Sequence, residues 1–228
     1  MKNRIIKPVA HIKTDFKDKF GIPRQSCRVP SLTGTIIFEK EFRDKNALKG
    51  LEDFSHLWLL FDFSESHQET FSPTVRPPRL GGNKRVGVFA SRSPFRPNSI
   101  GLSSVEILEI LDTKEFGTVL KVGGVDILDG SAIYDIKPYL PSSDCHQNAK
   151  GGFADEFNDY HLEVVIPENI LSEFDKDFIS TIIDLIKEDP RPSYQTDEDR
   201  VYKMNFSGFD VSFNVKKDTA YITSIKKI

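Results

Sequence analysis

Residues 92–103, RSPFRPNSIGLS, combine side chains that recognise anions with residues that stiffen a loop. The two arginines offer planar forks of donors suited to carboxylate or phosphate, and Phe95 between them offers a ring face for stacking on a nucleobase or adenine. The two prolines restrict the backbone before a ligand arrives, which lowers the cost of ordering the loop. The pattern predicts a binding loop, with a proline-rich surface loop carrying solvated arginines as the alternative.

Basic residues cluster around this loop, and acidic residues are missing from it. The chain has 34 Asp and Glu against 31 Lys and Arg, a net charge of −3, yet no acid occurs at 70–105. A concentrated basic segment in a mildly acidic protein favours an anionic partner such as RNA. An ordinary solvated face is the alternative for Lys84 and Arg85. The basic residues of this window are Arg76, Arg79, Lys84, Arg85, Arg92 and Arg96.

Three further loops extend this theme. GIPRQS (21–26) and TVRPPRLGGNKR (74–85) are again basic and proline-stiffened, whereas LDGSAIYDIKPYLP (128–141) carries acids beside aromatic residues. Because each loop borders a short strand, we expect all of them to converge at one end of a barrel. The Asp-Gly pair also suits an ordinary hairpin turn. Asp135 and Lys137 lie two apart, so on a strand they would face the same side and could pair with each other.

Short strands must position these loops. Many strands in succession, without helices between them, favour an antiparallel sheet or barrel over a doubly wound fold. A single helix is expected among the strands, at 43–54. The predicted strands are rich in Val, Ile and Phe and bounded by turn residues, and they cover 5–12, 33–40, 56–63, 85–91, 103–111, 118–128 and 132–140.

The last third of the chain has a different character. A polar, turn-rich linker is expected at 141–152, and alternation around SG and KKD turns predicts a three-stranded meander at 200–225. The predicted fold is therefore α+β, mainly β: a small antiparallel β-barrel domain at 1–150 and a smaller α+β domain at 151–228. One amphipathic helix is predicted within 167–190 from an apolar stripe formed by Leu171, Phe174, Phe178, Ile182 and Leu185.

Other protein classes fit the composition poorly. The chain lacks the apolar core of a signal peptide and any run of eighteen apolar residues, so we expect a cytoplasmic protein without membrane association. Cys27 and Cys145 form neither a metal-ligand nor a disulfide pattern, so free thiols and no metal are expected. Neither cysteine lies in a nucleophile motif and no GxSxG elbow occurs, which argues against a hydrolase.

Six segments carry a family resemblance, in this order: PRQ (23–25), FSHLWLLFDF (54–63), TVRPPRLGG (74–82), VGVFASRSPFRPNSIGLSSVEI (86–107), LDGSAIYDIKPYLP (128–141) and DPRPSY (189–194). Together they closely resemble the TsaA-like, TrmO-type tRNA methyltransferases. A match to several long segments in order is far more specific than any single motif, and this one covers essentially the whole chain.

The resemblance implies an S-adenosylmethionine-dependent enzyme that methylates the exocyclic amine of threonylcarbamoyl-adenosine beside the anticodon in tRNA. It also implies a small β-barrel catalytic domain that works as a homodimer. The chain has no GxGxxG turn before a helix, which agrees with a methyltransferase that is not of the Rossmann type. Carried over by motif, the cofactor-binding residues are Pro23, Arg24, Gln25, Arg92, Leu102, Asp129, Gly130, Ser131 and Ala132.

Two places depart from the family pattern. Members place a polar pair, often His-Gln, just after the HLW strand. Here Ser64 and Glu65 occupy the aligned positions and His67 and Gln68 follow, so either pair is a candidate for the cofactor site. RPNSIG and DGSA stand where members commonly read RPNPIG and DGTP, which reduces local rigidity without changing a charge.

The chemistry implied by the resemblance needs a proton acceptor and an anion-binding surface. Methylation leaves a proton on the attacking amine, and Asp135 or Asp129 is the candidate acceptor, with water as the alternative. The arginines expected to face tRNA phosphates or the threonylcarbamoyl carboxylate are Arg76, Arg79, Arg85, Arg96 and Arg191.

A non-catalytic β-barrel RNA-binding module is the rival hypothesis. It explains the basic segment and Phe95 equally well. It does not explain the acidic loop at 128–141, because acids repel phosphate, whereas a sulfonium cofactor with ribose hydroxyls welcomes a carboxylate.

Overall fold

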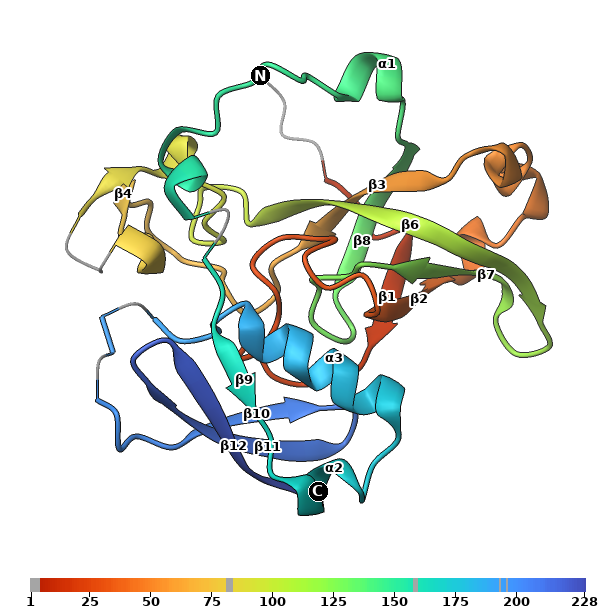
Figure 1. Cartoon of the computed structure of the whole chain (residues 1–228). Helices are drawn as coiled ribbons and strands as arrows, with labels where there is room; N and C mark the ends of the chain where they lie inside the picture. Colours follow the sequence, from red (N-terminus) through yellow and green to blue (C-terminus); the bar gives the residue numbers. More distant parts are fainter. Residues whose placement is uncertain (1–4, 81–83, 158–159, 193, 196) are drawn as a thin grey trace.

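Six antiparallel strands close into a barrel in the computed structural model, which describes residues 5–80, 84–157, 160–192, 194–195 and 197–228 (Figure 1). Along the strands, side chains alternate between the interior and the outside: in β3, Leu57, Leu59 and Phe61 are buried and their neighbours are not. The predicted barrel is therefore confirmed. Around it the strands follow the order β1 (Ala10–Thr14), β2 (Thr33–Phe38), β7 (Gly117–Gly123), β6 (Ile100–Thr113), β3 (His56–Asp62) and β8 (Ala132–Pro138).

Several strand boundaries differ from the prediction. The first strand begins only at Ala10, because Pro8 has no N–H to give to a ladder. β7 ends at Gly123 rather than Leu128, since Gly124 turns the chain with a φ of +70°. The segment predicted as a strand at 85–91 contributes nothing to the barrel.

That segment forms a small ribbon and a turn instead. β5 (Val86–Gly87) pairs only with β4 (Thr74–Val75), and the 3₁₀ turns η4 (Pro78–Leu80) and η5 (Val88–Ala90) follow these strands. The ribbon carries the basic segment, and its residues 81–83 lie outside the described part of the chain. The arginine loops are thus displayed beside the barrel rather than built into its wall.

The helix predicted at 43–54 is wrong. Three 3₁₀ turns occupy this stretch: η1 (Lys40–Phe42), η2 (Lys45–Leu48) and η3 (Leu51–Asp53). Asp44 caps η2 by accepting a hydrogen bond from the N–H of Asn46, but Lys49 is extended and Gly50 has a φ of +86°. A left-handed residue interrupts a helix, so the apolar spacing alone was not sufficient to build one.

A second, four-stranded sheet occupies the carboxyl-terminal third. The predicted meander is confirmed as β10 (Tyr202–Phe206), β11 (Phe209–Lys216) and β12 (Thr219–Lys227). β9 (Glu163–Val165) adds a strand parallel to β12, which the sequence did not reveal because three residues carry no readable alternation.

The predicted carboxyl-terminal helix is split in two. α2 (Glu168–Leu171) ends before Asp175, whose carboxylate caps α3 (Lys176–Lys187) by accepting the N–H groups of residues 177 and 178. Ile182 and Leu185 are buried, as the stripe predicts, but Leu171 is exposed. The stretch expected as a linker contains a turn of helix, α1 (Pro141–Asp144), and is followed by η6 (Gly152–Phe157).

One continuous hydrophobic core runs through both sheets, and α3 lies between them in Figure 1. The connection is made by segment 15–32, which leaves β1 and packs on the second sheet. The ring of Phe16 lies 5.3 Å from that of Phe206, and Phe20 stacks on Phe213 at 6.5 Å. Gly21 has a φ of +100°, and a side chain there would meet Met204 at 2.4 Å. Segment 15–32 therefore belongs to the packing of both halves.

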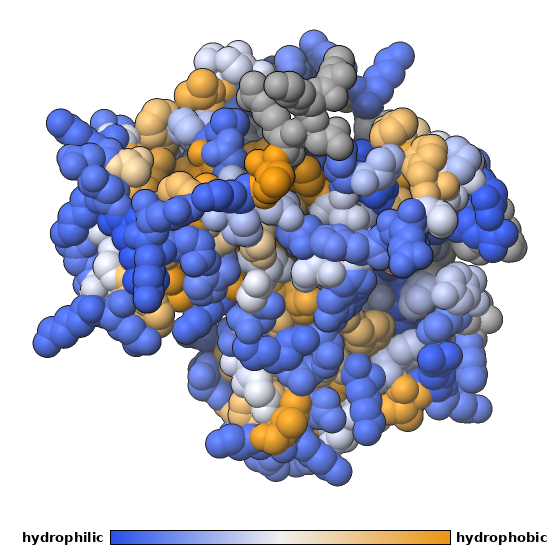
Figure 2. All heavy atoms as spheres, turned by 180° about the vertical axis from the view of Figure 1, so that it is seen from behind, coloured by the Kyte–Doolittle hydropathy of each residue, from blue (hydrophilic) through white to orange (hydrophobic). Residues whose placement is uncertain are grey.

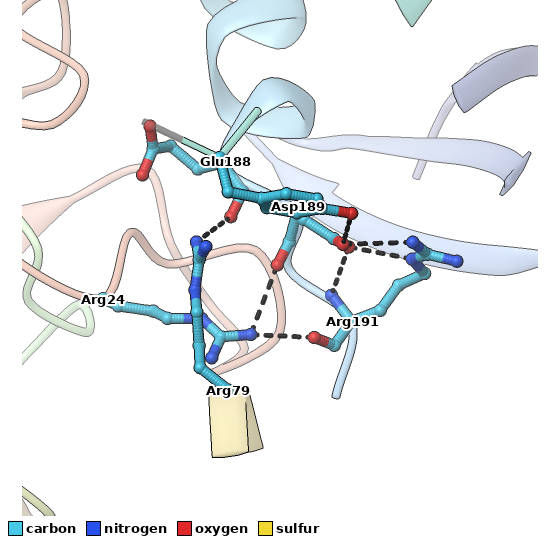
Figure 3. A network of polar contacts seen from close by, with 6 residues as sticks. Arg24, Arg79, Glu188, Asp189 and Arg191 are labelled. Carbon is cyan, nitrogen blue, oxygen red and sulfur yellow. Dashed lines mark hydrogen bonds and ion pairs between the residues drawn. The ribbon is translucent and has the colours of Figure 1, made fainter. Parts of the chain in front are cut away.

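A polar cluster borders this shared core, and we call it the 188–191 clamp (Figure 3). Arg24 donates to the carbonyl oxygens of Asp189 (3.3 Å) and Arg191 (2.7 Å). Arg79 donates to the carbonyl of Glu188 (3.0 Å). Arg191 in turn forms a bidentate pair with Asp189, with N–O distances of 2.8 and 3.0 Å. Two arginines from the amino-terminal half thus hold the turn that follows α3.

One carboxylate of the clamp, that of Glu188, is paired across the two halves. Glu188 accepts from the Nε of Arg28 at 2.8 Å and lies 3.3 Å from the Nδ1 of His161. Asp189 adopts a φ of +46°, a backbone conformation that Asp tolerates better than most residues. The clamp therefore combines ion pairs and carbonyl acceptors within a largely buried turn.

The bidentate pair of the clamp predicts a large effect on stability. Its two side chains are only 11% and 10% exposed, so replacing Arg191 by Met leaves the carboxylate of Asp189 buried without its cation. We expect the free energy of unfolding to fall by about 3 kcal/mol, measured by urea denaturation. Arg76→Met, at an exposed position, is the matched control and should change little.

The double variant Asp189→Asn with Arg191→Met separates a lost pair from lost packing. Because it removes the orphaned charge as well, it should recover part of the stability that the single variant loses. A single variant as stable as the control would contradict the assignment of the clamp as a stabilising contact.

Candidate cofactor and RNA site

The structure brings together two of the predicted cofactor loops. The guanidinium of Arg92 donates to the side-chain oxygen of Gln25, and the amide nitrogen of Gln25 donates to the carbonyl of Arg24. Pro23 is buried beneath this loop, whereas Arg92 is exposed. The loops at 21–26 and 92–103, which lie far apart in sequence, therefore meet through their most polar residues.

Asp126 lies directly behind this meeting point and was missed in the sequence. The hydroxyl of Ser103 donates to its carboxylate at 2.6 Å, and the backbone N–H of Ser26 is a second donor. Burial raises the pKa of Asp126 to about 6, against the lowering effects of these hydrogen bonds and of the charge on Arg92. The spacing of the two acids in VDILDG is a signal for such a site, but the prediction of one strand over 118–128 obscured it.

Asp129 is engaged in holding a turn. Its two oxygens accept from the backbone N–H of Thr14 (2.9 Å) and the ammonium of Lys17 (2.5 Å). Burial alone would raise the pKa of Asp129, but these hydrogen bonds hold it below its usual range. A carboxylate of low pKa is a weak proton acceptor, so this environment favours a positioning role.

The residues after Asp129 lead into β8. Gly130 has a φ of +77°, and a Cβ atom placed there would meet no other atom within 4 Å. A ligand therefore has room to approach the backbone at this position. Ser131 is buried, and Ala132 pairs with His11 on β1. The turn and the start of the strand are therefore anchored to β1, with an open position between them.

Asp135 pairs with Lys137 on the outer face of β8. The ammonium lies 2.7 Å from one carboxylate oxygen, and both side chains are about half exposed, at 46% and 62%. The same-face pairing that the spacing allows is thus the one observed. Leu102 is also outward-facing and exposed, and it pairs with Leu60, whose other neighbour is Asp135.

The two candidate polar pairs after β3 lie in different surroundings. Lys19 donates to the carbonyl of Glu65 at 2.6 Å, while Ser64 is exposed. His67 instead lies 2.8 Å from the carboxylate of Asp62, which also hydrogen bonds the phenol of Tyr134. Burial, together with this carboxylate, raises the pKa of that phenol.

Gln68 lies at a different feature, a cavity of about 110 Å³ lined by residues 68–72 and 95–97. The cavity connects the polar stretch after β3 with the loop at 92–103. Both pairs therefore stay candidates, with Glu65 tied to segment 15–32 and His67 tied to the barrel.

The five arginines predicted to bind RNA divide into two groups. Arg79 and Arg191 belong to the 188–191 clamp, where Arg79 joins the two halves of the molecule and Arg191 pairs with Asp189. Arg85 donates to the hydroxyl of Thr74 (2.7 Å), and Arg96 donates to the carbonyl of Ser91 (3.1 Å). Arg76 is exposed. The surface available to a nucleic acid thus rests mainly on the second group.

Exposed aromatic rings accompany these arginines. Phe89 is 75% exposed and its ring lies 6.4 Å from that of Phe71, and Phe95 is also exposed. Hydrophilic side chains cover most of the face seen in Figure 2, with apolar groups in small separate patches. Rings of this kind among cations suit stacking on unpaired bases.

The described residues include no helix long and apolar enough to cross a membrane. In the same part of the chain, no three His, Cys, Asp or Glu residues lie close enough together to hold a metal ion. Both cysteines are exposed free thiols. Partial desolvation of the Cys27 thiol, and then the charge of Asp126, raise the pKa of Cys27.

Two family models match the chain. The tRNA-methyltransferase O N-terminal domain matches residues 11–145, and the TrmO C-terminal domain matches residues 161–228. These ranges contain the closed barrel and the second sheet, respectively.

Relatives and solved structures agree with these models. The chain is 37% identical over 216 residues to the tRNA (adenine(37)-N6)-methyltransferase of Escherichia coli, covering 90% of each protein. It is 36% identical over 225 residues to a Pseudomonas aeruginosa protein named as a putative S-adenosylmethionine-dependent methyltransferase, RcsF, covering 92% of this chain and 91% of that one. A crystal structure of TrmO from P. aeruginosa superimposes with a TM-score of 0.80 at 29% identity, covering 100% of this chain and 99% of that chain.

The sequence matches cover nearly the whole chain, and the structural match includes both sheets and their connection. The chain belongs to the tRNA-methyltransferase O family of S-adenosylmethionine-dependent enzymes.

Proposed function

We propose that this protein transfers a methyl group from S-adenosylmethionine to the N6 amine of threonylcarbamoyl-adenosine beside the anticodon of tRNA. The observation that carries the proposal is the contact between Gln25 and Arg92, which joins two predicted cofactor loops next to the basic segment. The relatives from Escherichia coli and Eikenella corrodens are named as tRNA (adenine(37)-N6)-methyltransferases, which supports adenine in tRNA as the substrate class.

The donor set suits S-adenosylmethionine. Arg92 offers an exposed guanidinium for the carboxylate of the amino acid part, and Gln25 offers an amide for polar groups. Leu102 is an exposed apolar side chain of the kind that covers an adenine ring, and Gly130 leaves room for close approach. When bound, the cofactor supplies the activated methyl carbon.

The chain's own task is alignment and control of the amine proton. Holding two reactants in a reactive geometry can supply several kcal/mol, about 7–11 in the best intramolecular systems. The paired loops at 21–26 and 92–103 restrict the cofactor side, and the proline-stiffened arginines restrict the RNA side. Asp135 is proposed as the proton acceptor, because the hydrogen bonds to Asp129 hold the pKa of that carboxyl below its usual range and make it a weak acceptor.

The threonylcarbamoyl group adds a carboxylate to the substrate. A guanidinium fork matches that group better than an ammonium does, which makes Arg96 and Arg76 its proposed partners. The same proposal includes a homodimer acting in the cytoplasm, as the family resemblance implies.

Nucleoside mass spectrometry tests the reaction. Purified protein is incubated with S-adenosylmethionine and tRNA that carries threonylcarbamoyl-adenosine. The tRNA is then digested to nucleosides, whose masses are measured. We expect a methyl gain on that nucleoside, and no gain on tRNA that carries unmodified adenosine at the same position. Equal methylation of both tRNAs would refute the modified nucleoside as the required substrate. Binding of tRNA without any methylation would favour the RNA-binding module.

Replacing Asp135 by Asn tests its role. If this carboxylate accepts the amine proton, turnover should fall by about 100-fold or more while the dissociation constant of S-adenosylmethionine stays unchanged. Lys137→Met is the companion variant, since it removes the partner of Asp135 and leaves the carboxylate in place. Normal turnover by Asp135→Asn would remove the residue from the mechanism and leave water as the acceptor.

The basic segment should make tRNA binding dependent on salt. Counterion release predicts a linear fall of log affinity with log salt, and each lost phosphate contact should reduce the slope by about one. We expect this reduction for Arg76→Ala and for Arg85→Ala, measured by filter binding. Lys114→Ala, a substitution at an exposed position on the turn between β6 and β7, should leave the slope unaltered. A salt-independent affinity would contradict phosphate contacts by this segment.

A further inference from the structure

We infer that Asp126 is a positioning residue that holds the Gln25–Arg92 pair in place for the cofactor. The inference rests on the proposed cofactor site. Asp126 lies in the segment between β7 and β8, so its carboxylate reaches both loops from the barrel side. Its role is to act through Arg92 and loop 21–26 rather than to contact the reacting amine.

The contacts of Asp126 join a rigid wall to a loop. Ser103 is buried in β6, and its hydroxyl donates to the carboxylate at 2.6 Å. Ser26 donates its backbone N–H from the loop side, directly after Gln25. The next residue, Cys27, fixes the loop again through an N–H bond of 2.8 Å to the carbonyl of Gly124. Asp126 is therefore the side chain that connects loop 21–26 to the barrel strand.

The charge of Asp126 has no direct ion pair in the described part of the chain. Arg92 acts on the carboxylate through space, and this is the cation that also bonds Gln25. The thiol of Cys27 is the other titratable group that faces the carboxylate, and Glu106 acts on that thiol in turn. A poorly solvated carboxylate with one distant cation costs stability, so its value to the protein must come from what it orients.

The other two acids of this region are less suited to the task. Asp129 is bound to Thr14 and Lys17, and Asp135 is bound to Lys137 on the outer face of β8. Neither has a contact, among the described residues, with the loop that carries Gln25. Asp126 alone of the three combines a donor from that loop with the field of Arg92.

The pH dependence follows from the direction of the pKa shift. The pKa of Asp126 in the folded protein is about 6, above the ordinary value of 3.8. The fold therefore loses stability through this group as pH rises from 3.8 to about 6, whereas the charged carboxylate orients Arg92 only above about 6. Stability and cofactor affinity should respond in opposite directions when this charge is removed.

Asp126→Asn tests the inference with the full-length protein. At a pH well above 6, isothermal titration with S-adenosylmethionine should show a dissociation constant raised about tenfold or more. The thermal midpoint without ligand should not fall, and kcat at saturating cofactor should change little. Asp112→Asn, at an exposed carboxylate paired with Lys45 at the far end of β6, is the matched control and should bind normally.

Ser103→Ala provides a second variant that keeps the charge. The hydroxyl of Ser103 lowers the pKa of Asp126, so without it the pH at which wild-type affinity is lost should move upward. The difference in affinity between wild-type protein and Asp126→Asn should also vanish as pH falls below about 6.

The outcomes separate the proposed function from the inference about Asp126. Wild-type protein that binds no S-adenosylmethionine would refute the proposed function. Normal wild-type binding with an unchanged dissociation constant in Asp126→Asn would overturn this inference alone. A kcat loss without a change in affinity would also overturn it, because a positioning residue for the cofactor must act on binding.

Discussion

The packing of segment 15–32 between the barrel and the second sheet is the contact on which the rest of this structure depends. Phe16 and Phe20 insert into the second sheet, and Gly21 permits the backbone to approach Met204 where any side chain would collide. Only after this packing does the chain reach Arg24 and Gln25. The proposed cofactor loop is thus placed by a hydrophobic contact with a distant part of the chain.

This arrangement explains why arginines of similar sequence context have different roles. A guanidinium binds phosphate and carboxylate equally well, so local sequence cannot distinguish an RNA contact from a structural one. Arg79 and Arg191 lie in motifs that resemble the family, yet both are bound in the 188–191 clamp. Arg24 is likewise directed to the carbonyls of that clamp. The turn at 188–191 therefore supports the proposed cofactor loop.

The three acids of this region lie in different environments. Asp129 is surrounded by donors and holds a turn, Asp135 is exposed beside a lysine, and Asp126 is poorly solvated with its cation at a distance. Burial and hydrogen bonds act in opposite directions on a carboxylate. Burial prevails at Asp126 and raises its pKa, whereas the hydrogen bonds prevail at Asp129 and lower its pKa.

The sequence by itself determined the architecture and the family. Turn residues between short apolar segments were sufficient to predict the barrel and the meander, because alternation and turn chemistry are local properties. The six ordered motif segments were not needed for these two predictions, whereas the family resemblance depended on them. Local pattern failed where backbone geometry decided: Gly50 breaks the helix expected at 43–54, and Asp175 starts α3 only after α2 has ended.

Only the tertiary structure decided which charges pair. Residues far apart in the chain meet in the contact of Gln25 with Arg92, in the clamp around Glu188 and Asp189, and in the hydrogen bond from Ser103 to Asp126. Desolvation and ion pairing depend on distances that are set by the complete fold, and no sequence spacing encodes them. The chemistry of the proposed site was therefore readable from residue types, whereas the role of each residue followed from its three-dimensional surroundings.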